Sequence, residues 1–128
     1  MAKILLIEDD EAFRDFLSAE LQRIGHAVTV ASSGQYVVHG IGKTDFGVVF
    51  DVIITDIVMP DVDGLEVIHL LRAASPACRI VAISGGSRYD HSNLYLALAE
   101  AFGAKVTLAK PFSVAELSDV IDGVILAA

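Results

Sequence analysis

The sequence predicts one α/β domain with a doubly wound parallel sheet, covered by helices on both faces. Short apolar runs alternate with segments of helical periodicity along all 128 residues. The apolar runs are continuous, as in strands that are buried on both faces of a sheet. The length fits one domain, and no Pro/Ser-rich linker, low-complexity tract or internal repeat divides the chain.

Five strands and five helices are expected in alternation. The strands are the aliphatic and β-branched runs 3–7, 27–31, 51–55, 79–83 and 105–109. The helices are expected at 13–24 with a stop at Gly25, over 35–42, over 64–75, over 91–102 with a stop at Gly103, and from Ser113 onward.

Local signals support the first and last helices and weaken the second. Apolar residues recur at helical spacing in the first helix, at Phe13, Phe16, Leu17, Leu21 and Ile24. Ser113 and Glu116 form an S-x-x-E capping box. Two glycines, Gly40 and Gly42, interrupt the segment 34–50, which is therefore the least regular part of the prediction.

Composition and charge exclude several classes of protein. Hydrophobic residues make up 54% of the chain, enough for a core and for an apolar surface that meets a partner. No apolar run reaches the roughly 18 residues of a membrane span, and the N-terminus lacks a signal-peptide cleavage site. We therefore expect a cytoplasmic protein without membrane contact. The net charge of −8 disfavours direct binding to nucleic acid.

Cysteine and histidine point to no chemistry of their own. The one cysteine, Cys78, excludes an internal disulfide and is interpreted as a small core or edge residue. The four histidines show no metal-ligand spacing; they are His26, His39, His69 and His91.

Charged and polar residues follow four of the five predicted strands. They are Glu8, Asp9 and Asp10 after the first strand, Asp56 after the third, Ser84 after the fourth and Lys110 after the fifth. Ligands of parallel α/β sheets bind at the carboxyl ends of the strands, so these groups are expected to converge there.

The converging groups have the chemistry of a phosphoryl-accepting site. Crowded carboxylates at Glu8, Asp9 and Asp56 repel one another unless a cation intervenes, and Mg²⁺ suits such oxygen ligands. Lys110 and Ser84 could then hold phosphoryl oxygens, while Asp56 attacks phosphorus to give an aspartyl phosphate.

Other acidic residues have simpler interpretations. Asp10 and Glu11 are expected to serve the first turn of the first helix. Asp61 and Asp63 are expected to shape the loop before Gly64. Asp51 lies at the opposite end of its strand, and we assign it no chemistry.

The chain resembles the receiver domain of bacterial two-component response regulators, of the chemotaxis-regulator-like kind. The resemblance is carried by ILLIEDDEAFR (4–14), DVIITDIVMPDVDG (51–64), RIVAIS (79–84) and LAKPFSVAEL (108–117). It implies a flavodoxin-like sheet of order 2-1-3-4-5 with five helices. It also implies that residues 1–128 form one receiver domain with no effector domain.

The resemblance implies a role for each site residue. Asp56 matches the phosphoacceptor, and Glu8 and Asp9 match the acidic pair. Mg²⁺ would be held directly by Asp9, Asp56 and the backbone carbonyl of Val58, and by Glu8 mostly through water. Ser84 matches the switch hydroxyl, and Lys110 matches the lysine of the K-P motif, whose Lys–Pro bond is commonly cis in the family.

The implied partners are a histidine kinase or a histidine phosphotransfer protein as donor, and a downstream protein target. The domain would catalyse its own phosphorylation and dephosphorylation without being an enzyme that acts on a foreign metabolite.

Three features depart from the family pattern. Thr107 stands where an aromatic ring is usual, so the familiar inward turn of that ring cannot operate. Val58 and Gly86 offer no polar group to position water, which predicts dephosphorylation on the order of minutes or longer. The segment 34–50 is longer than usual, and the extra residues are expected to lengthen the second helical region or its loop.

The fourth predicted helix is apolar nearly all round, between Leu94 and Phe102. Its outer side is either an exposed patch for a homodimer mate or another partner, or simply rich in Ala and Leu.

Two other functions stay open at this point. A Mg²⁺-dependent phosphatase of the haloacid-dehalogenase type would have its nucleophile after the first strand in a D-x-D pattern. A binding-only receiver would lack part of the acidic set or Lys110. A dinucleotide-binding domain is excluded because no G-x-G-x-x-G follows the first strand.

Overall fold

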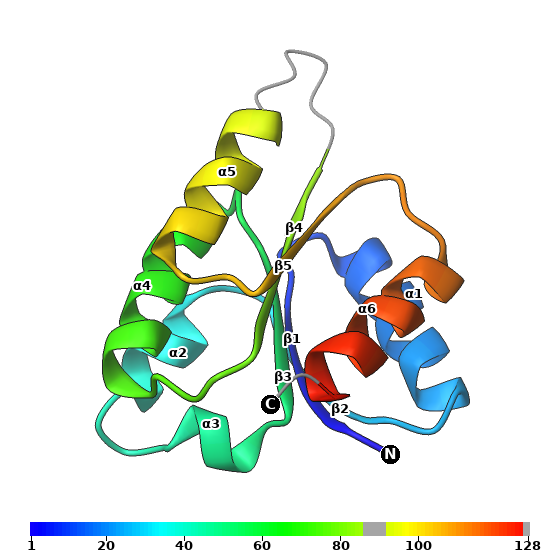
Figure 1. The fold of residues 1–128 in the computed structure, drawn as a ribbon, viewed down its shortest axis with the longest axis horizontal. Coiled ribbons are helices and arrows are strands. Elements are labelled where there is room, and N and C mark those ends of the chain that lie inside the picture. Colours follow the sequence, from blue (N-terminus) through cyan, green and yellow to red (C-terminus); the bar gives the residue numbers. More distant parts are fainter. Residues whose placement is uncertain (86–91, 127–128) are drawn as a thin grey trace.

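The computed structural model describes residues 1–85 and 92–126, and a five-stranded parallel sheet runs through its centre (Figure 1). The strands are β1 (Lys3–Ile7), β2 (Ala27–Ala31), β3 (Val52–Asp56), β4 (Ile80–Ser84) and β5 (Val106–Ala109). Their order in the sheet is β2-β1-β3-β4-β5, and all neighbours are parallel. The predicted α/β class and the strand order are therefore confirmed.

The boundaries of three strands differ slightly from the prediction. The last three strands begin one residue later than expected, and β3 and β4 also end one residue later. Asp56 pairs with Ile83, and Ser84 pairs with Ala109, so both site residues are the last members of their strands. Pairing with a neighbouring strand extends the ladder to residues whose polarity suggested a loop.

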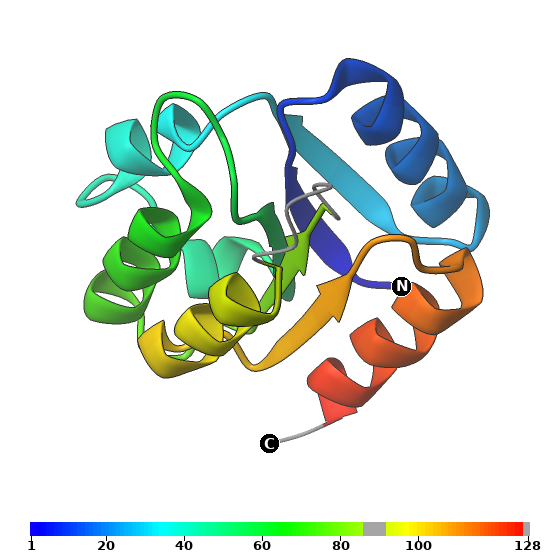
Figure 2. The same cartoon turned by 90° about the horizontal axis from the view of Figure 1, so that it is seen from above.

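Six helices surround the sheet in the described residues. They are α1 (Glu11–Arg23), α2 (Gln35–Gly40), α3 (Phe46–Val49), α4 (Gly64–Ala74), α5 (Ser92–Phe102) and α6 (Val114–Leu126). In Figure 1, α1 and α6 cover one face, and α2 to α5 lie on the other; Figure 2 shows the same layers from above.

The prediction of five helices was wrong because the segment 34–50 forms two. The helix expected over 35–42 stops at Gly40, and Gly42 follows with a φ of +83°. The C-cap residue Ile41 has extended backbone and ends the helix, and the left-handed backbone at Gly42, which favours glycine, keeps it from resuming there. The chain resumes as the one-turn helix α3, which buries Phe46. The extra residues of this segment thus build a second short helix.

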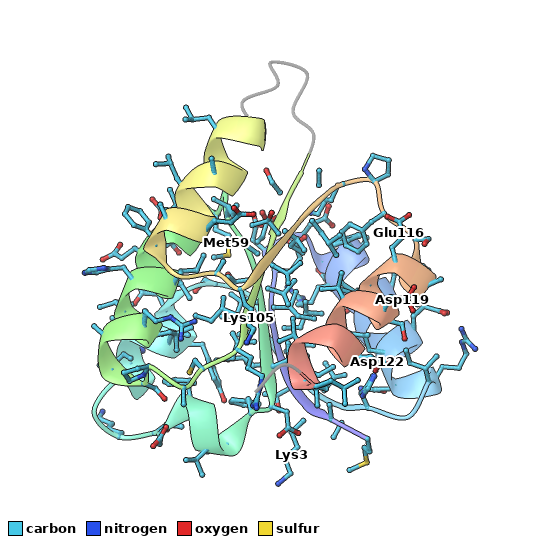
Figure 3. All side chains as sticks on the ribbon, viewed as in Figure 1. Lys3, Met59, Lys105, Glu116, Asp119 and Asp122 are labelled. Atoms are coloured by element: carbon cyan, nitrogen blue, oxygen red, sulfur yellow. The ribbon has the colours of Figure 1, made fainter. Side chains whose placement is uncertain are left out.

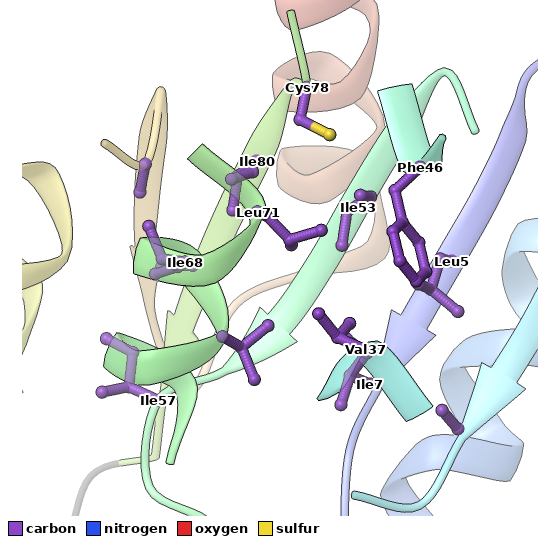
Figure 4. Close-up of a cluster of buried hydrophobic side chains, with 14 of the residues drawn as sticks. Leu5, Ile7, Val37, Phe46, Ile53, Ile57, Ile68, Leu71, Cys78 and Ile80 are labelled. Atoms are coloured by element: carbon purple, nitrogen blue, oxygen red, sulfur yellow. The ribbon is translucent and has the colours of Figure 1, made fainter. Parts of the chain in front are cut away.

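Alternate residues of the central strands fill two separate cores. One core lies under α2 to α5 and includes Leu5, Ile7, Ile53, Ile80 and Leu71 (Figure 4). The other lies under α1 and α6 and includes Ile4, Leu6, Ile54, Val81 and Ile121. Burial on both faces explains why these strands are continuously apolar. Cys78 is buried in the first core, as expected.

Helix α1 presents a narrower apolar face than its sequence suggests. Leu17 and Leu21 are buried against the sheet, whereas Phe16 is 55% exposed and Ile24 is 37% exposed. Of the five apolar positions at helical spacing, these two therefore lie outside the core. Asp10 caps this helix as predicted, since its carboxylate accepts a hydrogen bond from the Phe13 amide.

Two further helix starts are capped by side chains. The Asp63 carboxylate accepts from the Glu66 amide, which begins α4. The predicted capping box is confirmed: Ser113 Oγ accepts from the Glu116 amide, and the Ser113 amide donates to Glu116 Oε1. Farther along α6, Glu116, Asp119 and Asp122 project outward from the sheet (Figure 3). None of the described helices is both long and apolar enough to cross a membrane.

Candidate functional site

The carboxyl ends of β1, β3, β4 and β5 bring the predicted site residues to one edge of the sheet. Glu8 and Asp9 follow β1, Asp56 ends β3, Ser84 ends β4 and Lys110 follows β5. Glu8, Asp56 and Ser84 are buried, while Asp9 is exposed. Each of Glu8, Asp9 and Asp56 offers a carboxylate oxygen within 4.8 Å of the other two. The convergence expected from the strand ends is therefore present.

Lys110 places its ammonium between two of these carboxylates. Its Nζ donates to Glu8 Oε1 at 2.7 Å and to Asp56 Oδ2 at 3.4 Å. The face of the Phe13 ring covers the ammonium, with its centroid 4.2 Å from Nζ. The Lys110–Pro111 peptide bond is cis, as the resemblance implied.

Backbone groups hold the two buried carboxylates in place. Glu8 Oε2 accepts a hydrogen bond from the Asp9 amide, and Asp56 Oδ1 accepts one from the Val58 amide. Arg14 donates from Nη1 to the Glu8 carbonyl, which ties α1 to the end of β1. The carboxylates therefore have restricted orientations before any ligand arrives.

Burial dominates the electrostatics of Glu8. Desolvation, with the hydrogen bond and charge of Asp56, raises the pKa of Glu8 to about 8 although Lys110 acts in the opposite direction. For Lys110, burial disfavours the charged form, but its contacts with Glu8 and Asp56 outweigh this and raise the pKa above its ordinary value. Glu8 and Asp56 thus share the ammonium of Lys110. Glu8 therefore keeps its proton to a higher pH than an ordinary glutamate does.

The hydroxyl of Ser84 is the unpaired group of the site. Among the buried side-chain polar atoms of the described residues, Ser84 Oγ is the one without a hydrogen-bond partner. Leaving a buried hydroxyl unpaired usually costs about 1–3 kcal/mol. The unpaired hydroxyl of Ser84, at the same sheet edge as Lys110, fits a site that receives further oxygen atoms. The carboxylates of Glu8, Asp9 and Asp56 fit a hard divalent cation.

A close approach of α4 also shapes the site. A Cβ on Gly64 would overlap the carbonyl oxygen of Asp56, so the start of α4 packs directly on the end of β3. The sequence indicated Gly64 as a helix start, without this contact. The sequence placed Phe13 among the apolar residues at helical spacing and did not identify it as the cover of Lys110. No local signal could have identified it, because the contact joins α1 to the loop after β5.

Two residues that depart from the family pattern, Thr107 and Val58, lie within the described part of the chain. Thr107 lies on β5, and its Oγ1 donates to Glu100 Oε1 on α5 at 3.2 Å. The Val58 side chain is 55% exposed beside Asp56 and presents no polar group. Gly86, like His91, lies outside the described residues.

The strand order and the acidic strand ends are those of the receiver class of signalling domains. Residues 4–122 match the family described as the response regulator receiver domain, so the chain belongs to this family of two-component signalling proteins. Membership favours a receiver over the phosphatase alternative.

Individual relatives agree with this assignment. The chain is 32% identical over 128 residues to the response regulator receiver protein CpdR of Brucella abortus, covering all of both sequences. It is 34% identical over 125 residues to the DNA-binding transcriptional regulator NtrC of Azospirillum brasilense, covering 94% of this chain and 24% of that one. The crystal structure of a receiver domain protein from Clostridium thermocellum superposes with a TM-score of 0.83 at 27% identity, covering 98% and 94%. The chain spans less than half the length of several curated relatives that it matches.

Proposed function

We propose that this receiver domain accepts a phosphoryl group on Asp56 in a Mg²⁺-dependent reaction and thereby changes its binding to other proteins. One observation carries the proposal. Three carboxylates, the Lys110 ammonium and the unpaired Ser84 hydroxyl meet at one edge of the sheet. This set combines a nucleophile, a metal-binding group and two donors for phosphoryl oxygens.

Within this proposal, Asp9, Asp56 and the backbone carbonyl of Val58 ligate Mg²⁺, and Glu8 acts through water. The oxygen donors and the exposure of Asp9 suit an ion that keeps several waters. When bound, Mg²⁺ neutralises charge on the phosphoryl oxygens during transfer.

The donor is a histidine kinase or a histidine phosphotransfer protein. An Asp56 carboxylate oxygen attacks phosphorus in line while the bond from phosphorus to the donor histidine nitrogen breaks, and the nitrogen keeps the electron pair. Lys110 and Ser84 then pair with phosphoryl oxygens. Water later releases phosphate from Asp56, so the protein modifies itself and acts on no foreign metabolite.

The output is a change in protein binding. Movement of Ser84 toward a phosphoryl oxygen would alter the face formed by α5, β5 and α6. Leu94 and Phe102 are exposed on α5, so this face also offers a contact for self-association. A downstream protein, rather than nucleic acid, suits a surface with a net charge of −8.

Intact-protein mass spectrometry after incubation with acetyl phosphate and Mg²⁺ tests the proposal. We expect the added mass of one phosphoryl group, which is acid-stable, hydroxylamine-labile and absent without Mg²⁺. Asp56→Asn should not gain it, whereas Asp61→Asn, in the exposed loop nearby, should.

The proposal would be contradicted if the wild type gained no phosphoryl mass from acetyl phosphate although Mg²⁺ binding was demonstrated, and if a purified donor kinase also failed to phosphorylate it. The binding-only alternative would then account for the fold.

A further inference from the structure

The Lys110 ammonium has an aromatic partner as well as two acidic ones. The centroid of the Phe13 ring lies 4.2 Å from Nζ, well within the roughly 6 Å over which a ring face attracts a cation. The same Nζ donates to Glu8 Oε1 at 2.7 Å and to Asp56 Oδ2 at 3.4 Å. The position of the ammonium at the sheet edge is therefore set by the ring together with the carboxylates.

The Phe13 ring is itself held in place from two directions. Asp10 Oδ1 accepts a hydrogen bond from the Phe13 amide at 3.1 Å, which fixes the backbone at the start of α1. The ring of Phe112 packs edge-on against that of Phe13, with centroids 6.0 Å apart and planes at 82°. Phe112 lies two residues after Lys110, so the loop that carries the ammonium also orients the ring that faces it.

A ring face suits an ammonium that has to bind an incoming oxygen. Lysine has a flexible four-carbon stem, and holding its ammonium at one point costs conformational entropy. Of the three N–H donors, Glu8 and Asp56 accept from two, and no third acceptor is present within residues 1–85 and 92–126. The ring attracts the charge without supplying an oxygen that would compete with a phosphoryl oxygen for the third donor.

We propose that Phe13 is a positioning residue for phosphoryl transfer to Asp56: the face of its ring, rather than its bulk, holds the Lys110 ammonium where a phosphoryl oxygen arrives. This inference rests on the proposed function, because it assigns Phe13 a role in the same site. Phe13 takes no part in the bonds that form and break. It acts through Lys110, since a donor that is already in place needs no reorganisation during transfer.

The experiment compares Phe13→Leu, which keeps an apolar side chain, with Phe13→Tyr, which keeps the ring face, both in the full chain. Intact-protein mass spectrometry follows the rate of phosphoryl gain from acetyl phosphate at saturating Mg²⁺, or from the donor kinase if that alone modifies the wild type. We expect Phe13→Leu to react about fivefold more slowly or worse, and Phe13→Tyr to stay within about twofold of the wild type. Phe16→Leu, the same substitution at an exposed ring of α1, is the matched control and should react as the wild type does.

Two further readouts separate positioning from damage to the fold. The affinity for Mg²⁺, measured by calorimetry, should be no weaker in Phe13→Leu, because the proposed ligands are carboxylates and a carbonyl rather than Lys110. The NMR signals of the Lys110 Cε protons should be shifted upfield by the ring current in the wild type and in Phe13→Tyr, but not in Phe13→Leu.

Equal rates in the wild type and Phe13→Leu would overturn the proposal, as would a loss of rate in Phe13→Tyr as large as that in Phe13→Leu. Weaker Mg²⁺ binding in Phe13→Leu would also overturn it, and would assign Phe13 a structural role only. A wild type that gains no phosphoryl mass from either donor contradicts the proposed function and this inference with it, whereas the upfield shift would still show the contact between Phe13 and Lys110.

Discussion

Lys110 Nζ lies 2.7 Å from Glu8 Oε1, although the two residues are 102 positions apart in the sequence. The contact joins the loop after the last strand to the end of the first strand. Glu8 is fully buried there, and the same ammonium also reaches Asp56. One cation thus faces two buried acids, and this imbalance makes the site sensitive to protons and to added cations.

The stability of the metal-free protein should fall as pH rises from 4.5 to about 8. Burial and Asp56 raise the pKa of Glu8 to about 8 from an ordinary 4.5, so the folded chain keeps a proton that the unfolded chain has released. Between these values the folded state binds more protons, and the free energy of unfolding must decrease with pH. We expect a loss on the order of a few kcal/mol, measured by urea denaturation.

Glu8→Gln is the control for this pH dependence. It cannot titrate, so its stability should vary much less than that of the wild type over the same range. Equal pH slopes in the two proteins would show that Glu8 is not the group responsible.

Gly64→Ala should destabilise the protein by about 1–3 kcal/mol, because its Cβ would overlap the Asp56 carbonyl and push α4 away from β3. Gly123→Ala is the matched control. Gly123 lies within α6, with no atom close to its missing Cβ, and alanine should stabilise the helix by about 0.5–1 kcal/mol. Thermal or urea denaturation measures both changes, and equal effects would contradict the packing of α4 on β3.

Thr107→Val should cost about 0.5–1.5 kcal/mol through loss of the hydrogen bond to Glu100. Glu100→Gln keeps an acceptor oxygen and should lose less. Because the Thr107 hydroxyl donates to Glu100 on α5, we expect Thr107→Val to gain phosphoryl mass from acetyl phosphate as the wild type does. A variant that folds with full stability, yet no longer accepts phosphoryl, would assign Thr107 a direct role in the site instead.

Val58→Gln should shorten the lifetime of the phosphorylated protein roughly tenfold. Val58 is exposed beside Asp56, so glutamine can reach water near the phosphoryl group without disturbing the core. The phosphorylated wild type should persist for minutes or longer, as followed by mass spectrometry after removal of acetyl phosphate. Val48→Gln makes the same substitution at a still more exposed valine, on α3, and should leave the lifetime unchanged. Loss of phosphoryl within seconds in the wild type would refute the slow-hydrolysis prediction.

Patterns along the chain were sufficient to predict most of the architecture. Continuous apolar runs predicted the five strands within one residue, because burial on both faces demands uninterrupted hydrophobicity. The polar residues at the strand ends predicted the membership of the site, since parallel strands place their carboxyl ends together. Capping residues such as Asp10 and Ser113 also behave as predicted, because they act on backbone groups within three positions.

Contacts between distant segments were beyond the reach of these patterns. The cover of Lys110 by Phe13, the bond between Thr107 and Glu100, and the anchoring of Arg72 on Gly103 each join different elements. Periodicity indicates that a helix has an apolar face but leaves open the angle and depth at which it docks. These are set by the packing of all neighbouring side chains together, and they place Phe16 outside the core and Phe13 over the ammonium.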